Sequence, residues 1–256
     1  MPVARVILGW RPTGTPTPPP EPGNRFSLDP VAVNSDGLRE QRAIGYESAR
    51  PEVQALIPTS ARNILELGCS SGALGAAIKK RQDARIFGVE LSPTYAADAR
   101  GSLDDVFQGS VEDFLYCEAP ASAPFDCLVA ADVLEHLADP WAALVEASQL
   151  LGPDATVVVS LPNVLWGPGL LRIVLSGRWP RDAEGVFDST HLRWFGLEDA
   201  LDLLRQAGLE PDVVLPSFWS SGVRLFVKRS ILWHTPLRRF LAAQYLVSAR
   251  KPAISS

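Results

Sequence analysis

Residues 63–72 read NILELGCSSG, a short apolar stretch that ends in a turn with two glycines. The apolar run predicts a buried strand, and the helical periodicity over 73–80 predicts a helix directly after the turn. A loop between a parallel strand and a helix lies at the carboxyl edge of the sheet, where open α/β sheets bind ligands. Gly68 and Gly72 allow the backbone to turn tightly and to approach a ligand closely.

Strand and helix patterns alternate outward from this turn. Strands are expected at 63–67, 85–91, 104–108, 125–130, 155–161, 213–215 and 245–248, and helices at 73–80, 92–100, 140–151 and 197–207. Strands separated by helices predict right-handed crossovers and a parallel sheet, but no clear crossover helix separates the last two strands. The pattern predicts an α/β, Rossmann-like seven-stranded mostly parallel sheet, with helices on both faces and the last strands antiparallel.

Composition limits the class of protein. The 256 residues fit one α/β domain with additions, and 46% hydrophobic residues suffice for a sizeable core. A net charge of -5 argues against nucleic acid as a partner, since that needs a clustered basic surface. The three cysteines show neither zinc-site nor disulfide spacing, which favours a reducing, cytoplasmic location. We see no secretory signal, and no uninterrupted apolar run reaches the roughly 20 residues of a membrane span.

The chain is expected to consist of an N-terminal extension over 1–35, with a proline-rich linker, and one domain over 36–256. Two inserts are expected in that domain. Residues 162–195 are irregular and rich in Trp, Gly and Pro, and a long irregular insert in a compact domain is usually functional. Residues 217–243 form a second, amphipathic insert before the last strand.

An acidic residue, Glu90, ends the second predicted strand. A carboxylate there can accept two hydrogen bonds from a ribose diol. A nicotinamide dinucleotide site is the competing interpretation, but its G-x-G-x-x-G fingerprint lacks its middle glycine, because Ser70 stands two positions after Gly68. A pyrophosphate would crowd against the Ser70 side chain, whereas a cofactor without phosphates fits better.

Four stretches resemble, in order, the motifs of class I S-adenosylmethionine-dependent methyltransferases. These are ILELGCSSG (64–72), the second-strand acidic motif GVELSP (88–93), the adenine-contacting segment GSVEDF (109–114) and the fourth-strand motif FDCLVAADVLEHLADP (125–140). The resemblance covers roughly residues 44–211 and departs from the pattern at Ser70. It implies S-adenosyl-L-methionine as the cofactor and S-adenosyl-L-homocysteine as the product.

The resemblance also implies which residues bind the cofactor. Glu66 and Gly68 would flank the methionine moiety, and Glu90 would bind the ribose hydroxyls. The other cofactor-binding residues that it implies are Cys69, Ser70 and Gly72 in the first turn, Leu91 against the adenine, Ser110, Val111 and Glu112 around the adenine pocket, and Ala131 and Asp132 covering the cofactor. Tyr46 and Arg50 resemble residues that close over the amino-acid end.

The acceptor is expected under residues 162–195. Their end, DSTHLRWF (188–195), resembles a D-x-T-H-L-R-x-F segment of methyltransferases that act on small molecules in cell-wall and natural-product pathways, and more distantly ubiquinone-type O-methyltransferases. The resemblance implies a small-molecule or sugar acceptor and O-methylation. Its aromatic side chains would wall the pocket or form a small core under the loop.

A hydroxyl acceptor needs a base. His191, with Asp188 to orient it, is one candidate, although it could instead tie the insert to the core. His136 is the other candidate, although it could instead cap the next helix. We assign no metal, although Asp132, Glu135 and His136 resemble the E-x-x-E-H cluster of some ubiquinone-pathway enzymes.

Two further alternatives remain open. The basic, apolar stretch 224–243 is either an amphipathic helix that makes a peripheral membrane contact or a solvated helix packed on the sheet. The alternatives to a methyltransferase are a regulatory or scaffold protein that binds S-adenosylmethionine without turnover, and an NAD-dependent oxidoreductase. The oligomeric state is not predicted.

Overall fold

The computed structural model of the chain describes residues 47–116, 120, 122–218 and 235–253. The chain divides into two compact units, Met1–Arg39 and Glu40–Ser256, and every described residue belongs to the second unit. The N-terminal extension expected over 1–35 lies outside the described residues, and so does Tyr46.

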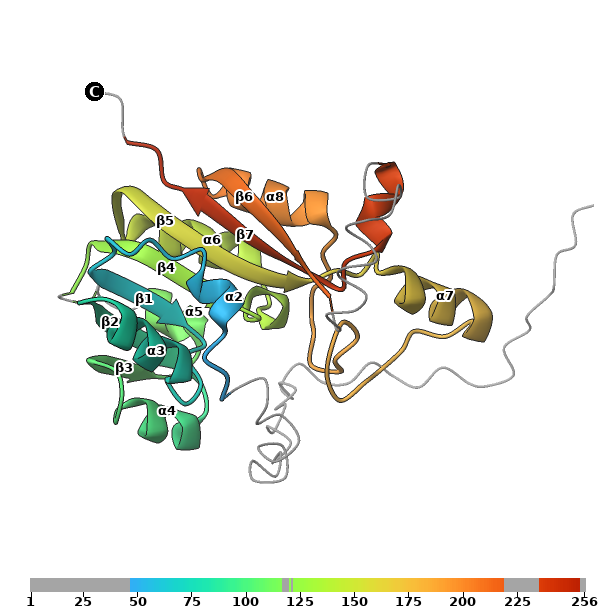
Figure 1. Cartoon of the computed structure of the whole chain (residues 1–256). Helices are drawn as coiled ribbons and strands as arrows, with labels where there is room; N and C mark the ends of the chain where they lie inside the picture. Colours follow the sequence, from blue (N-terminus) through green and yellow to red (C-terminus); the bar gives the residue numbers. More distant parts are fainter. Residues whose placement is uncertain (1–46, 117–119, 121, 219–234, 254–256) are drawn as a thin grey trace, which may run out of the picture. The chain divides into compact units, whose positions relative to one another are not determined.

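The core of the second unit is a seven-stranded sheet in the order β3-β2-β1-β4-β5-β7-β6 (Figure 1). The strands are β1 (Asn63–Leu67), β2 (Arg85–Glu90), β3 (Asp105–Gln108), β4 (Phe125–Ala131), β5 (Leu151–Pro162), β6 (Glu210–Ser217) and β7 (Gln244–Arg250). β1 to β5 pair in parallel, and β7 lies antiparallel between β5 and β6. The predicted Rossmann-like sheet is confirmed.

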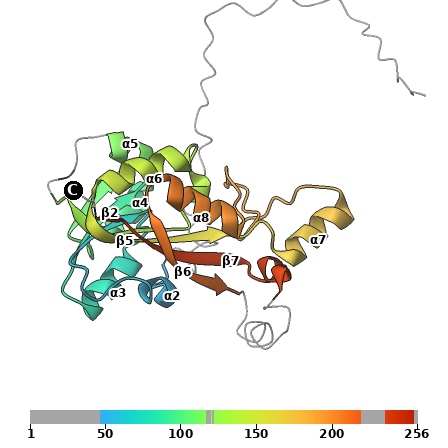
Figure 2. The same ribbon diagram turned by 90° about the horizontal axis from the view of Figure 1, so that it is seen from above.

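Helices cover both faces of this sheet (Figure 2). One face carries α2 (Pro51–Gln54), α3 (Ala73–Arg81) and α4 (Pro93–Ala99), and the other carries α5 (Val111–Tyr116), α6 (Pro140–Gln149) and α8 (Leu197–Gln206). Side chains alternate along each strand, so Ile64 packs into the core of the first face and its neighbour Leu65 into that of the second.

Local sequence signals place the helix starts. Ser92 accepts a hydrogen bond from the Tyr95 N–H and precedes a proline, and Asp139 accepts one from the Ala142 N–H in the same way. Both starts follow the carboxyl ends of parallel strands. As a result, the loops that precede these helices lie along one edge of the sheet, where the predicted site residues fall.

Residues 162–195 depart from the expected irregular structure, because they contain the helix α7 (Gly167–Ser176). Pro168 stands in its first turn, where a missing N–H costs nothing, and Gly177 ends it with a positive φ of 62°. α7 lies beyond the end of β5, outside the layers of the sheet (Figures 1 and 2).

The second expected insert, 217–243, is described only at its ends. Residues 235–243 contain the short 3-10 helix η3 (Pro236–Phe240), and residues 219–234 lie outside the described residues. Within the described ranges, no helix combines the length and hydropathy needed to cross a bilayer.

Candidate functional site

The turn after β1 contacts the end of β2. The Cys69 N–H donates to the Val89 carbonyl at 3.0 Å, and the Ser70 N–H donates to Glu90 Oε2 at 2.8 Å. The other Glu90 oxygen, Oε1, accepts from the Ser92 N–H at 2.8 Å. The glycine turn and the downstream acid therefore form one site.

The backbone of this turn is tightly constrained. Gly68 has φ 66°, and a Cβ there would lie 2.5 Å from Val133 Cγ2; Gly72 has φ 79° and lies close to the Ala99 backbone. Ser70 also has a positive φ, 49°, which is uncommon for a residue with a side chain. Its buried Oγ has no hydrogen-bond partner among the described residues, so the turn accepts serine under strain.

Two buried carboxyl groups face this turn. Glu66 is 4% exposed, and its Oε2 has no hydrogen-bond partner in the described part of the chain. Burial, followed by the nearby Glu90 charge, raises the pKa of Glu66 to about 8. Burial also raises the pKa of Glu90, although the backbone N–H groups of Ser92 and Ser70 partly offset it. An ammonium group and a ribose diol are partners that would satisfy these acids, so the turn suits an adenosyl group that carries an amino acid.

The residues predicted to surround the adenine differ in how far their side chains are buried. Leu91 is 70% exposed and is available to pack on a flat ring. Ser110 caps α5 by accepting from the Asp113 N–H at 2.9 Å, and Glu112 lines a cavity of about 220 Å³ between α5 and the start of α6.

Two predicted cofactor residues have their side chains in the core instead. Val111 packs with the core of one face. Cys69 packs with the core of the other, where a Cβ on Gly88 would lie 2.6 Å from its Sγ. Contacts from these two residues to a bound cofactor would therefore come from their backbone.

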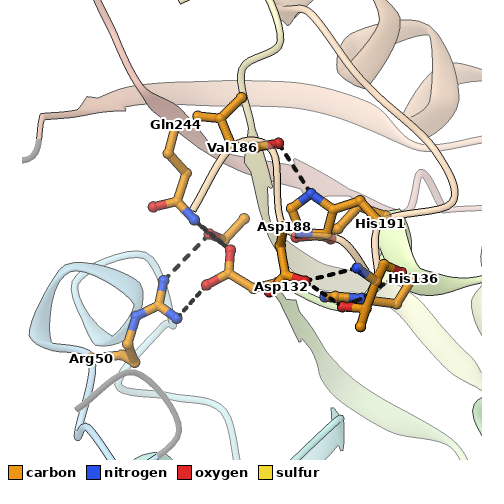
Figure 3. A network of polar contacts seen from close by, with 10 residues as sticks. Arg50, Asp132, His136, Val186, Asp188, His191 and Gln244 are labelled. Carbon is orange, nitrogen blue, oxygen red and sulfur yellow. Dashed lines mark hydrogen bonds and ion pairs between the residues drawn. The ribbon is translucent and has the colours of Figure 1, made fainter. Parts of the chain in front are cut away.

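Asp132, just beyond Ala131 at the end of β4, is the centre of a polar network (Figure 3). Its Oδ2 accepts from Arg50 Nη1 at 2.7 Å, and its Oδ1 accepts from Ser160 Oγ at 2.8 Å and from Gln244 Nε2. The Arg50 guanidinium also pairs with Glu52 at 2.6 Å. Arg50, expected at the amino-acid end of the cofactor, and Asp132, expected to cover the cofactor, thus lie together.

His191 is buried at the same edge of the sheet. Its Nδ1 lies 3.1 Å from the Val186 carbonyl, which can only accept, so Nδ1 carries the proton and Nε2 carries the lone pair. Burial lowers the pKa of His191, and His136, whose ring centroid is 4.8 Å away, lowers it further. His191 is therefore neutral at pH 7, as a base must be.

Glu135 lies next to His191 and was not among the predicted catalytic residues. It is 1% exposed, its two oxygens have no hydrogen-bond partner in the described ranges, and Oε1 lies 4.0 Å from His191 Nε2. Burial first, and then the charge of Asp132, raise the pKa of Glu135 well above its ordinary value. Its backbone carbonyl accepts from the Leu192 and Arg193 N–H groups, so the insert is anchored at this residue.

Asp188, predicted to orient His191, accepts from the His191 N–H through its backbone carbonyl at 3.0 Å. Its Oδ1 accepts from the Thr190 N–H at 2.8 Å and from Thr190 Oγ1 at 2.7 Å. Thr190 Oγ1 in turn lies 3.2 Å from Nδ1 of His136, the other candidate base. The carbonyl of Val186 also contacts the His191 ring, and a backbone group leaves no signal in the sequence.

Three side chains that could bind a metal ion also lie close together here. They are not the same three residues that the sequence indicates. Donor atoms of Glu135, His136 and His191 lie within 4.8 Å of one another. Asp132, the first residue of the resembling cluster, is bound to Arg50 instead. Two imidazoles and a carboxylate suit a borderline divalent ion, so these three residues are the ones that would hold a metal.

The matching protein family is the one described as methyltransferase domain, which matches residues 38–214. A ubiquinone biosynthesis O-methyltransferase from Cereibacter sphaeroides is 28% identical over 187 residues, which cover 69% of this chain and 70% of that protein. One of the same name from Xylella fastidiosa is 32% identical over 124 residues, which cover 46% of this chain and 49% of that protein. The chain thus spans about half the length of that second relative.

A solved structure shares the fold. The S-adenosylmethionine-dependent methyltransferase of Thermotoga maritima, described as a possible histamine N-methyltransferase, is 21% identical, with a TM-score of 0.57. The superposition covers 85% of this chain and 94% of that one. Since the family match spans more than half of the 256 residues, the chain belongs to the methyltransferase domain family, whose methyl donor is S-adenosylmethionine.

Proposed function

We propose that this protein transfers the methyl group of S-adenosylmethionine to a hydroxyl oxygen of a small-molecule or sugar acceptor. The observation that carries the proposal is the meeting of two kinds of group at one edge of the sheet. Buried acids that suit the cofactor lie at the ends of β1 and β2, and a neutral histidine lies beside the end of β4. The relatives named as O-methyltransferases support oxygen as the methylated atom.

In this proposal the bound sulfonium supplies an electrophilic methyl group, and the chain supplies alignment and a base. Glu90 accepts hydrogen bonds from the ribose, and Glu66 faces the ammonium group. Arg50 pairs with the carboxylate of the methionine moiety. His191 Nε2 takes the proton of the acceptor hydroxyl, which leaves the oxygen free to attack the methyl carbon.

Glu135 favours a second form of the same reaction. Its two oxygens lack hydrogen-bond partners among the described residues, and a divalent ion held by Glu135, His136 and His191 would satisfy them. In that case the metal would supply Lewis acidity that makes the acceptor hydroxyl more acidic, the two histidines would be ligands, and the hydroxyl proton would pass to water. Metal content of the purified protein, and turnover before and after chelation, separate the two forms.

The peripheral membrane contact expected from 224–243 is retained as part of the proposal. Of that stretch, the described residues expose Leu237, Arg238 and Arg239, and η3 approaches the first residue of α7, Gly167. α7 itself exposes large apolar side chains, namely Leu171, Val174 and Leu175. We expect the protein to sediment with vesicles of anionic lipid and to stay in solution with neutral ones; equal recovery with both contradicts this contact.

Calorimetry and radiolabel transfer test the function itself. S-adenosylhomocysteine should bind at micromolar concentration, and NAD should not. Label from the methyl group of S-adenosylmethionine should enter pooled small-molecule extracts, and the His191→Ala variant is the matched negative control. Binding without transfer to any extract would favour the regulatory alternative, and binding of NAD alone would reverse the proposal.

A further inference from the structure

The strand β7 lies on the far side of the sheet from β1 and β2. Its first residue, Gln244, reaches the edge of the sheet at which β1, β2 and β4 end, which we call the cofactor edge. The carboxamide of Gln244 donates to Ser160 Oγ at 2.7 Å and to Asp132 Oδ1 (Figure 3). Ser160 is fully buried and itself donates to the same Asp132 oxygen at 2.8 Å. The Asp132 carboxylate is thus held from two neighbouring strands at once.

The backbone conformation of Asp132 is strained, and its surroundings hold the residue in that conformation. Asp132 has a positive φ of 59°, a conformation that non-glycine residues keep only where the surroundings impose it. Its N–H donates to the Ser160 carbonyl at 3.1 Å, so backbone and side chain are both fixed by β5. The second carboxylate oxygen, Oδ2, is left for Arg50 Nη1 at 2.7 Å.

Arg50 is held in turn. It has a positive φ of 45°, directly before α2, and its Nη2 lies 3.3 Å from Ser160 Oγ. The guanidinium is also held by Glu52, which accepts from Nε at 2.6 Å, so its direction is defined and two of its five N–H groups remain for an incoming carboxylate. Its direction depends on where the Asp132 carboxylate stands, and Gln244 helps to set that.

We propose that Gln244 is a positioning residue for cofactor binding, which acts through Asp132 on Arg50. A neutral carboxamide suits this task, because a cation at position 244 would compete with Arg50 for Asp132 and a carboxylate would repel Asp132. The proposal rests on the proposed function, in which Arg50 pairs with the methionine carboxylate of the cofactor. It gives the antiparallel strand β7 a part in the site that no sequence motif indicates.

A double-mutant cycle on the affinity for S-adenosylhomocysteine, measured by calorimetry, tests this inference. Gln244→Met keeps the length of the side chain and removes its donor, and it should weaken binding about five- to tenfold. In an Arg50→Met background the same substitution should change binding less than about twofold, because the group through which it acts is gone. Gln206→Met, at an exposed position of α8, is the matched control and should leave binding unchanged.

The cycle separates positioning from a general structural role. Equal losses in both backgrounds would show that Gln244 supports the fold and would overturn the inference, as would unchanged binding in Gln244→Met. Gln244→Glu is the second variant if Gln244→Met fails to fold, and it should weaken binding at least as much. If the unmodified protein does not bind S-adenosylhomocysteine, the proposed function itself fails.

Discussion

The cofactor edge and the insert that faces it are built in opposite ways. At the cofactor edge, polar groups come from the turn after β1 and the end of β2, and backbone N–H groups of Ser70 and Ser92 meet the Glu90 carboxylate. Where the insert meets the segment after β4, Glu135 and His191 are 56 positions apart and meet only through tertiary packing, 4.0 Å from one another. Backbone geometry therefore sets the first region, and packing of side chains sets the second.

This difference indicates how the two regions divide the work. A turn fixed by strand pairing presents the same donors whichever acceptor is bound, so it suits an invariant cofactor. A cluster on an insert can change its side chains without disturbing the sheet, so it suits a particular acceptor and its chemistry. Substitutions in the first region should therefore act on binding, and substitutions in the second on turnover.

The largest effect is expected at the insert. His191→Ala should lower kcat by about 100-fold or more if Nε2 is the base, because the variant loses the group that takes the hydroxyl proton. Affinity for S-adenosylhomocysteine should change less than about twofold, since His191 belongs to the other region. Steady-state kinetics and calorimetry on the same preparation measure both. His136→Ala is the comparison: a larger loss there would move the base to His136.

A smaller effect, and one on binding, is expected at the cofactor edge. Glu90→Ala should weaken S-adenosylhomocysteine binding by about 1–3 kcal/mol, because it removes charge-assisted hydrogen bonds to the ribose. Glu184→Ala, an exposed acid in the insert, should leave the affinity unchanged. Full affinity in Glu90→Ala would remove the ribose assignment and erase the contrast between the two regions.

How much the sequence predicts follows the same division. The strand ends and helix caps at the cofactor edge are local, so Gly68, Glu90 and Ser92 could be placed from their neighbours in the chain. The order of strands and helices along the chain could be predicted for the same reason. The conformation of Ser70, with its positive φ, follows from a motif that normally carries glycine.

What the sequence could not predict depends on contacts that no motif or residue type signals. The contact between the Val186 carbonyl and the His191 ring is one example, because no residue type signals a backbone carbonyl. Gln244 carries no motif. α7 was missed because Gly167, Pro168 and Gly169 look like helix breakers, although proline and glycine are tolerated in a first turn.

An intermediate effect is expected in the pH dependence of cofactor binding. The pKa of Glu66 is raised to about 8, and an ammonium group bound beside it would lower this pKa, so binding below pH 8 should release a proton. Affinity for S-adenosylhomocysteine should then rise with pH by up to about tenfold per unit until pH 8. Calorimetry in buffers of different ionisation enthalpy measures the proton, and Glu66→Gln should abolish its release.

The same raised pKa determines whether the free energy of unfolding rises or falls with pH. Between the ordinary value of 4.5 and about 8, the folded protein keeps a proton that the unfolded chain releases. The free energy of unfolding without cofactor should therefore fall as the pH rises through this window. Glu66→Gln should make that decline smaller without removing it, because burial also raises the pKa values of Glu90 and Glu135. An unchanged decline in the variant would assign it wholly to other groups.

The smallest effect on stability is expected at α7, and it contrasts this exposed helix of the insert with the buried helix α6. Leu175 is 78% exposed, whereas Leu144 of α6 is fully buried in the core. Leu175→Ser should change the free energy of unfolding by less than about 0.5 kcal/mol, while Leu144→Ala should cost about 2–5 kcal/mol. Urea denaturation measures both. A large loss in Leu175→Ser would place α7 in the core of the domain. A small loss leaves its apolar side chains unused by the fold, and weaker sedimentation of Leu175→Ser with anionic vesicles would then assign them to the lipid surface.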